Sequence, residues 1–164
     1  FQKAKKFAEN SFAKGLIFAG NCGIGKSHLA IAILNYRIQN NQFGIFIDTT
    51  ELLNEIRKSY DKDKDNNKFK TNIIDTVKNI DLLILDDVGT QKLTDWVKDI
   101  FFDLINFRYR NRDKCQTIIT TNHSTPVEFI EWFGKLEGSR IISRLLEMNE
   151  WIIYKDIDHR LKEL

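Results

Sequence analysis

Residues 20–27, Gly-Asn-Cys-Gly-Ile-Gly-Lys-Ser, follow the spacing G-x-x-x-x-G-K-[ST]. In such a loop, backbone N–H groups surround phosphate oxygens, and the N-terminus of the following helix favours the same anion. Gly23 and Gly25 allow backbone angles and a close approach that a Cβ would prevent. We expect Lys26 to reach the β- and γ-phosphates and the Ser27 hydroxyl to bind Mg²⁺. These residues therefore predict binding of a nucleoside triphosphate.

Two adjacent aspartates, Asp86 and Asp87, end the apolar stretch Leu82–Leu85. An ionised carboxylate beside a buried strand is costly unless a cation compensates it, and two neighbouring carboxylates repel each other. A turn at the strand end would explain one or both acids without any function. With a phosphate loop at the same edge of the sheet, we instead expect Asp86 to meet Mg²⁺ through the ligand shell of the metal. Asp87 would then orient or deprotonate the attacking water.

Three further polar residues follow later in the chain. Asn122 ends the stretch 117–122, and an amide there would lie near the γ-phosphate and the water, although Asn is also common in turns. Arg140 and Arg144 are four residues apart and share one face of a predicted helix. Such arginines are usually solvated, but in a nucleotide-binding protein they can reach the phosphate of a neighbouring subunit.

The segments that must position these residues alternate between short apolar runs and longer amphipathic ones. We predict strands over 15–20, 43–50, 81–87, 116–122 and 150–155. We predict helices over 26–41, 50–60, 71–80, 94–112, 125–133 and 136–148. Strand runs that are apolar throughout, instead of alternating, indicate a parallel sheet covered by helices on both faces.

Two local details of the helices are also predicted. Thr50 is in the position of an N-cap for the helix over 50–60. On the helix over 94–112, the core-facing side is expected to carry Trp96, Ile100, Leu104 and Phe107.

The composition is that of an ordinary globular chain. Its 164 residues are 42% hydrophobic and 29% charged, which suits one domain over 1–164. No apolar run approaches the roughly 18 residues that a membrane helix needs, so we expect no membrane partner. Cys22 and Cys115 are the only cysteines, which implies no disulfide framework and favours the cytoplasm. The three histidines are far apart and show no metal-ligand spacing.

In this order the motifs resemble the AAA+ ATPases, and most closely the helicase-loader group typified by DnaC and DnaI, together with the related IstB-type transposition ATPases. The resemblance covers nearly the whole chain. The segments that carry it are GNCGIGKSHLA (20–30), LLILDDVG (82–89), FRYRNRDKCQTIITTN (107–122), SRIISRL (139–145) and DIDHRL (156–161).

The resemblance implies an α/β P-loop AAA+ core, with a five-stranded parallel sheet of order 5-1-4-3-2 between helices. The chain departs from the family in one respect, because no separate lid domain is evident in it. It implies ATP or ADP as ligand, with Mg²⁺ on Ser27 and Asp86. The implied nucleotide contacts come from Gly20, Asn21, Cys22, Gly23, Ile24, Gly25, Lys26, Ser27 and His28, and from Arg160 as sensor 2. The implied catalytic residues are Lys26, Asp87, Asn122 as sensor 1 and Arg144 as arginine finger, which Arg140 would assist.

The resemblance also implies an activity, a Mg²⁺-dependent hydrolysis of ATP that serves to load a replicative DNA helicase onto single-stranded DNA. Many AAA+ proteins carry Glu where this chain has Asp87, and the shorter side chain implies slow hydrolysis. An arginine finger that acts in trans implies that hydrolysis depends on assembly with other copies. The helicase-binding region of the family lies N-terminal to the ATPase core. We therefore expect the chain, which starts at Phe1, to be a fragment.

Single-stranded DNA is the second implied partner. One candidate surface is the basic stretch 108–112, with Arg108, Arg110 and Arg112. Another is the segment 51–70, which combines cations with Tyr60 and Phe69 for base stacking. A solvated surface explains any one of these residues equally well. The net charge of +2 adds no independent argument for nucleic acid.

Three other functions stay open. An IstB-type transposition helper would carry nearly the same motifs. A non-hydrolysing module that uses ATP only for binding is a different class. The complete set of Lys26, Asp86, Asp87 and Asn122 argues against it without excluding it. A small-molecule P-loop kinase would need an acceptor site and an arginine-rich lid, and the sequence indicates neither.

Overall fold

The computed structural model describes residues 2–9, 14–61 and 70–154, which form seven helices and five strands. The strands are β1 (Gly15–Ala19), β2 (Gly44–Asp48), β3 (Leu82–Val88), β4 (Gln116–Thr121) and β5 (Asn149–Ile153). The helices are α1 (Gln2–Glu9), α2 (Lys26–Gln39), α3 (Thr49–Asp61), α4 (Lys70–Asn79), α5 (Asp95–Arg110), α6 (Pro126–Phe133) and α7 (Lys135–Met148). Every predicted helix and strand is present within a few residues of its expected bounds, and α1 is an addition.

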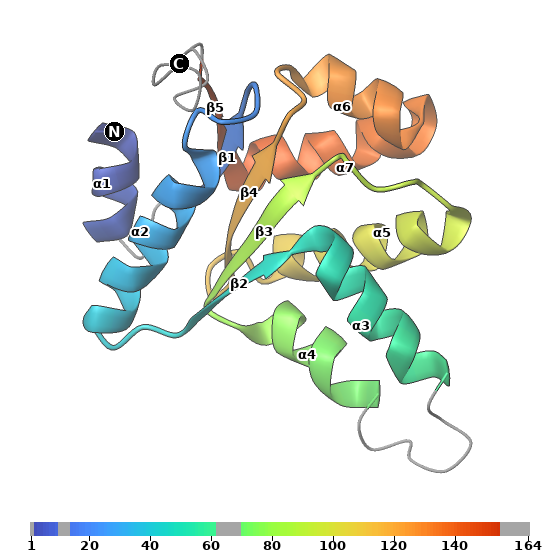
Figure 1. Cartoon of the computed structure of the whole chain (residues 1–164), viewed down its shortest axis with the longest axis horizontal. Helices are drawn as coiled ribbons and strands as arrows, with labels where there is room; N and C mark the ends of the chain where they lie inside the picture. Colours follow the sequence, from blue (N-terminus) through green and yellow to red (C-terminus); the bar gives the residue numbers. More distant parts are fainter. Residues whose placement is uncertain (1, 10–13, 62–69, 155–164) are drawn as a thin grey trace.

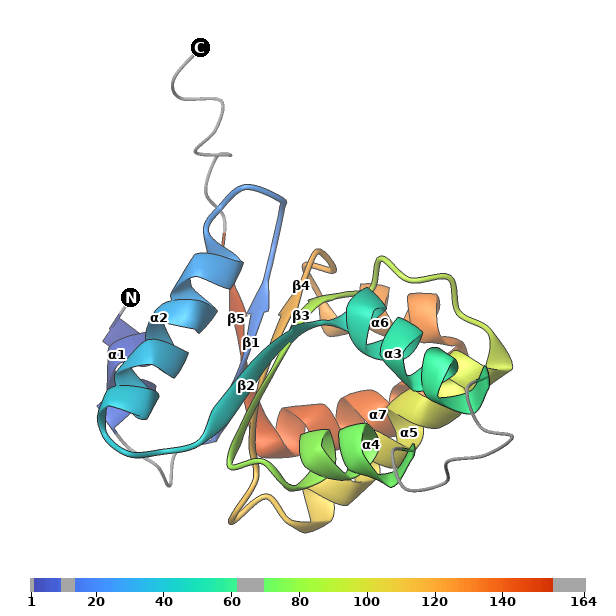
Figure 2. The ribbon, with the colours of Figure 1, turned by 60° about the horizontal axis from the view of Figure 1, so that its bottom comes forward.

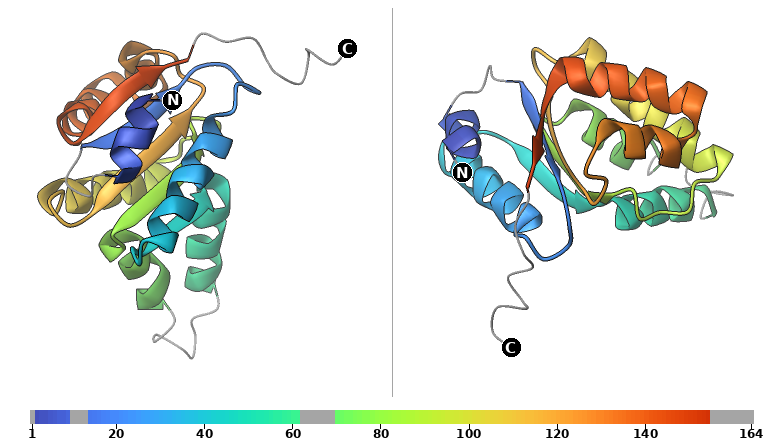
Figure 3. Two further views of the ribbon diagram at one scale, coloured as in Figure 1. Left: turned by 90° about the vertical axis from the view of Figure 1, so that its left-hand side faces the viewer. Right: turned by 90° about the horizontal axis from the view of Figure 1, so that it is seen from above.

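The strands form one sheet in the order β2-β3-β4-β1-β5, and all neighbouring strands are parallel. Read from the other edge, this is the expected order 5-1-4-3-2. Helices α1 and α2 cover one face, while α3 to α7 cover the other (Figures 1 and 2). The view from above in Figure 3 shows the three layers most plainly. None of the helices in the described ranges is long and apolar enough to span a bilayer.

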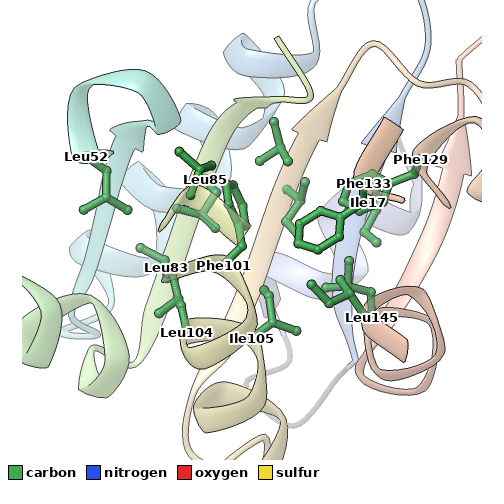
Figure 4. Close-up of a cluster of buried hydrophobic side chains, with 14 of the residues drawn as sticks. Ile17, Leu52, Leu83, Leu85, Phe101, Leu104, Ile105, Phe129, Phe133 and Leu145 are labelled. Atoms are coloured by element: carbon green, nitrogen blue, oxygen red, sulfur yellow. The ribbon is translucent and has the colours of Figure 1, made fainter. Parts of the chain in front are cut away.

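Alternation along the strands divides the core into two clusters. Leu16 and Phe18 of β1 pack toward α1 and α2, whereas Ile17 packs toward α5 to α7. On β3, Leu83 and Leu85 lie in the larger cluster (Figure 4), and Ile84 lies in the smaller one. Both faces of each inner strand are covered, so β1 and the first four residues of β3 are apolar on both sides, as the sequence indicated, whereas β4 buries three threonines beside Ile118 and Ile119.

The face that α5 buries differs from the predicted one by a rotation of about one residue. Its buried residues are Val97, Phe101, Leu104, Ile105 and Arg108. Trp96, Ile100 and Phe107 are only partly buried. Helix α5 packs against α4 and α7 as well as the sheet, so apolar residues extend around most of its circumference. Two overlapping rows of apolar residues with helical spacing therefore exist on α5, and the sequence alone does not indicate which row is the more deeply buried.

The predicted cap of α3 is also wrong, because Asp48 fills that role instead of Thr50. The Asp48 Oδ1 accepts a hydrogen bond from the Glu51 N–H at 2.9 Å. Thr49 is buried and donates its hydroxyl to the Asp86 carbonyl oxygen at 2.7 Å. The start of α3 is thereby fixed to the end of β3.

Arg108 is not available to DNA, contrary to the prediction from the basic stretch 108–112. Its side chain is 0% exposed. Its Nε donates to Thr117 Oγ1 at 2.9 Å, and Nη2 donates to the Gln116 carbonyl oxygen. Its Nη1 donates to carbonyl oxygens at the C-terminal end of α4, those of Val77, Lys78 and Ile80, at 2.9, 3.0 and 3.0 Å.

Arg108 therefore satisfies carbonyl oxygens at and just after the end of α4 that have no partner within the helix. Burial lowers the pKa of Arg108 to about 10, so the guanidinium stays charged at neutral pH. Of the other two arginines in the stretch, Arg110 is exposed, and Arg112 pairs with Glu147 at 3.5 Å.

A second buried arginine reaches the same strand end from the opposite helical layer. Arg37 of α2 is 3% exposed, and its Nη2 donates to the Phe7 carbonyl oxygen at 2.7 Å and to Gln116 Oε1 at 3.1 Å. Gln116, the first residue of β4, thus contacts Arg37 through its side chain and Arg108 through its backbone. Both helical layers are joined to the sheet at this edge.

We predict that Arg108→Met lowers the free energy of unfolding by at least about 3 kcal/mol, because each buried acceptor left without a donor costs about 1–3 kcal/mol. The exposed neighbour Arg110 supplies the matched control. Arg110→Met should change stability by less than about 0.5 kcal/mol in the same urea titration. Equal stability of the two variants would contradict the structural role of Arg108.

Candidate functional site

The loop of residues 20–25 joins β1 to α2 and depends on its glycines. Gly20, Gly23 and Gly25 have φ values of 136°, 76° and 86°, which L side chains rarely adopt. A Cβ on Gly20 would lie 2.5 Å from the Tyr154 carbonyl oxygen. The Gly20 N–H donates to the Thr121 carbonyl oxygen at 3.2 Å, which fixes the loop to the end of β4.

Lys26, the first residue of α2, connects this loop to the end of β4. Its Nζ donates to the Gly20 and Asn21 carbonyl oxygens, both at 2.7 Å, and to Asn122 Oδ1 at 2.9 Å. An ammonium group has three donors, and these three acceptors use all of them. Burial lowers the pKa of Lys26 from its ordinary value, and Cys22, Asp87 and Asp86 oppose that shift.

A cavity of about 710 Å³ opens beside the loop. The lining residues come from the loop, the start of α2 and the ends of β2, β3 and β4. They are Cys22, Gly23, Gly25, Lys26, Ser27, His28, Asp48, Asp86, Asp87, Thr120 and Asn122. The structure thus brings together most of the sequence-predicted site residues. Of the others, Gly20 and Asn21 hold Lys26, Ile24 is buried, and Arg160 lies outside the described residues.

Both acids of the Asp86–Asp87 pair line this cavity, although neighbouring residues of a regular strand point to opposite faces. A β-bulge explains the exception. From Leu85 to Val88 the strand β3 advances three positions, while the paired residues of β4, Ile119 and Thr121, advance two. Asp87 adopts a left-handed φ of 55° within this bulge, and Val88 returns to the core.

Thr120 links the two carboxylate residues and was not predicted from the sequence. Its hydroxyl donates to Asp86 Oδ1 at 2.6 Å, and its oxygen accepts from the Asp87 N–H at 2.9 Å. Threonine is an ordinary strand residue, so only its place two positions before Asn122 could have drawn attention to it.

Asn122 connects the acids with Lys26. Its Nδ2 donates to Asp87 Oδ1 at 3.1 Å, while its Oδ1 accepts from Lys26. The orientation of the amide follows from its neighbours, because an ammonium only donates and an ionised carboxylate only accepts. A continuous chain of hydrogen bonds therefore runs from Lys26 through Asn122 to Asp87.

Asp48 is a third carboxylate of the cavity that sequence reasoning missed. It ends β2 and is the strand partner of Asp86. The signal was present, since an apolar strand run ends in an acid here as it does at β3. Three carboxylates face one ammonium across the described cavity, so an anionic ligand needs a cation with it. Oxygen donors such as Ser27, Asp48 and Asp86 suit Mg²⁺ in chemistry.

Arg140 and Arg144 do not line the cavity beside the loop of residues 20–25. They lie on α7 and line a different groove with Tyr109 of α5 and Glu147. The Arg144 Nη1 donates to the Arg140 carbonyl oxygen at 2.9 Å, and its guanidinium lies 5.5 Å from the centre of the Phe102 ring. Arg144 therefore does not contribute to the cavity of its own chain in this structure.

A phosphate loop after β1, paired acids at the end of β3 and Asn after β4, on a sheet of this order, define an AAA+ type P-loop nucleotide-binding fold. The chain belongs to the family of IstB-like ATP binding proteins, whose model matches residues 3–163. Binding of ATP is the property that this family shares.

The chain is also similar to individual proteins of DNA replication. The chain is 28% identical over 165 residues to the replicative helicase loader DnaC of Buchnera aphidicola subsp. Baizongia pistaciae, covering 97% of this chain and 62% of that protein. A crystal structure of the DnaC helicase loader has a TM-score of 0.78 at 34% identity, covering 94% of this chain and 87% of that one. AMPPCP-bound DnaA from Aquifex aeolicus shares the fold, with a TM-score of 0.72 at 22% identity over 99% of this chain and 48% of that one.

We predict that Lys26→Met weakens ATP binding by about 1.5–3 kcal/mol, or roughly 10- to 150-fold, because a charge-assisted contact with phosphate is lost. Titration with a fluorescent ATP analogue measures the effect. Lys114→Met, a change of the same type at an exposed residue away from the cavity, should leave the affinity unaltered. Unchanged affinity in a folded Lys26→Met protein would exclude this loop as the nucleotide site.

Proposed function

We propose that this chain is the ATPase part of a cytoplasmic protein that loads a replicative DNA helicase onto single-stranded DNA. The observation that carries the proposal is its likeness to DnaC, 34% identical over 87% of a solved helicase loader. The chain spans 62% of the length of the DnaC from Buchnera aphidicola, so the helicase and DNA remain proposed partners. Residues 62–69 of the candidate DNA segment 51–70 lie outside the described residues, as do the side chains of Tyr60 and Phe69.

In this proposal the phosphates of ATP lie against the loop of residues 20–27 and the Lys26 ammonium. The Ser27 hydroxyl and the Asp86 carboxylate hold Mg²⁺, with Asp48 next to Asp86 in strand register. Mg²⁺ neutralises phosphate charge and fixes the orientation of the γ-phosphate. The carboxylates of the described cavity outnumber its ammonium, which favours ATP that arrives with a divalent cation.

Hydrolysis would use the chain of hydrogen bonds that ends at Asp87. Asp87 accepts a proton from the water that attacks the γ-phosphorus, and the bond from that phosphorus to the bridging oxygen of ADP breaks. Asn122 holds Asp87 Oδ1 at 3.1 Å and keeps that oxygen directed at the cavity. Asp is shorter than Glu, so the carboxylate lies farther from the water and the reaction is slow.

Completion of the site would require a second copy of the chain. Arg144 lies outside the cavity of its own chain, at a groove with exposed Arg140 and Ser143. A guanidinium delivered to the γ-phosphate of a neighbour stabilises charge in the transition state. Hydrolysis then depends on assembly, which suits a protein that acts as a switch on its helicase.

The family match also keeps a transposition helper as a second candidate, because the matching model is that of IstB-like proteins. Affinity capture with the complete gene product from its native cell distinguishes the two functions. We expect the replicative helicase in the eluate, and ATP-dependent loading when the purified components are mixed. Recovery of a transposase, with no effect on helicase loading, would overturn the loader function in favour of the helper.

We predict that Arg144→Ala binds ATP normally but hydrolyses it about 10³-fold more slowly, the lower end of the range for arginine fingers. Arg110→Ala, at an exposed arginine of α5, should keep the wild-type rate. Mixing Arg144→Ala with Asp87→Asn should restore part of the activity, because one interface of a mixed assembly then carries both intact groups. The readout is phosphate release as a function of protein concentration.

Two results would contradict a finger in trans. One is a mixture that stays inactive although both variants still assemble. The other is full activity of dilute wild-type monomer, which would leave Arg144 as a solvated arginine on α7.

A further inference from the structure

Gln91 is a buried polar residue that none of the roles above uses. It lies three residues beyond β3, and its side chain is 8% exposed. Its Nε2 donates to the Asp87 carbonyl oxygen at 2.9 Å, and its Oε1 accepts from the Gly89 N–H at 3.1 Å. The same Nε2 lies 3.0 Å from Thr90 Oγ1 and 3.3 Å from Thr50 Oγ1 of α3.

The side-chain amide thus spans the turn of residues 87–89, which comprises the bulged last two residues of β3 and Gly89. It supplies a donor to one end of the turn and an acceptor to the other. A primary amide offers both groups at neutral pH, whereas an ionised carboxylate offers only acceptors and a thioether offers almost none. The residue type is therefore matched to the two backbone groups that it contacts.

The opposite side of the same turn is closed by His123. A Cβ on Gly89, whose φ is 111°, would lie 2.5 Å from both Cδ2 and Nε2 of the imidazole. That ring is itself packed against Trp132 and Phe129, with ring centres 5.4 and 5.9 Å away. The turn is held between a hydrogen-bonding amide and a packed ring.

This fixation bears on the direction of the Asp87 carboxylate. Asp87 has a left-handed φ of 55°, an uncommon conformation for a residue other than glycine, which persists where the surroundings determine it. In a regular strand its side chain would point toward the larger core cluster, on the side of Leu85 and Val88. The contact of Gln91 with the Asp87 carbonyl oxygen opposes that rotation.

We infer that Gln91 is a positioning residue for ATP hydrolysis, which acts by holding the turn of residues 87–89 so that the Asp87 carboxylate faces the nucleotide cavity. Gln91 does not line that cavity, so it acts through Asp87 and not on ATP. The inference rests on the proposed role of Asp87 in hydrolysis. Hydrolysis at the wild-type rate would then require Gln91 in addition to the phosphate loop and the two aspartates.

The test compares Gln91→Met, which keeps the length of the side chain, with wild-type full chain. Affinity for the fluorescent ATP analogue should change by less than about threefold, because Gln91 is absent from the cavity lining. The single-turnover rate of hydrolysis should fall about 10- to 100-fold, the effect expected of a displaced catalytic group. Lys92→Met, at the exposed neighbour on the same loop, should preserve both values.

A double-variant cycle separates positioning of Asp87 from a general loss of stability. In an Asp87→Asn background, Gln91→Met should lower the rate no further, because the group that it positions is already gone. Thermal melting of each variant, at the protein concentration used for the rate measurement, confirms that the rates of folded proteins are compared.

The possible outcomes distinguish a failure of the Gln91 role from a failure of the proposed ATP hydrolysis. A wild-type protein that hydrolyses ATP while Gln91→Met hydrolyses it equally fast overturns the role of Gln91 alone. Additive losses in the cycle also overturn it, since Gln91 would then act independently of Asp87. A wild-type protein no faster than Asp87→Asn under assembling conditions overturns the proposed hydrolysis, and the positioning role with it.

Discussion

The ammonium group of Lys26 joins the carboxyl ends of three strands, and the rest of the site is arranged around it. It binds the carbonyl oxygens that follow β1 and the amide that follows β4, and that amide in turn binds the acid that ends β3. The loop glycines allow the carbonyl oxygens to turn toward Lys26, and the bulge of β3 brings Asp87 within reach of Asn122. Each of these local departures from regular structure is explained by convergence on one cation. The site is therefore a property of three strand ends held together and not of the loop alone.

The opposite edge of the sheet is held by cations of another kind. Arg37 and Arg108 are buried in different helical layers, and both contact Gln116 at the start of β4. Arg108 meets backbone carbonyls and a hydroxyl instead of a carboxylate, so its charge is dispersed over helix-end dipoles. One edge of the molecule thus offers an exposed cavity rich in charge, while the other uses charge to fix its helices. This division leaves the cavity edge free to respond to a ligand.

The sequence predicted the positions of the strands along the chain and most of the cavity because both follow from strong local signals, whereas the order of the strands in the sheet came from the family resemblance. Each strand contains a short apolar run, and the phosphate loop has a fixed spacing typical of a strand before it and a helix after it. The buried face of α5 was mispredicted because three neighbours bury that helix. Arg108 was taken for a surface residue because burial of arginine depends on carbonyl oxygens of α4, about thirty positions earlier, that no local pattern reveals. Thr120 and Gln91 were missed for a similar reason. Both contact the backbone of Asp87 in the bulge of β3, and the sequence of β3 does not predict that bulge.

The contact between Gly89 and His123 has a consequence for how proteins of this kind can diverge. The two residues are thirty-four positions apart, yet there is no room for even one additional carbon between them. A larger residue at position 89 is tolerated only if the residue at position 123 becomes smaller or turns away, and that change would remove a ring from the aromatic cluster on α6. The residue type allowed at position 89 therefore depends on the residue at position 123. Among descendants of a common ancestor a ring at position 123 should therefore be accompanied by glycine at position 89, where the φ of 111° is a second reason for glycine.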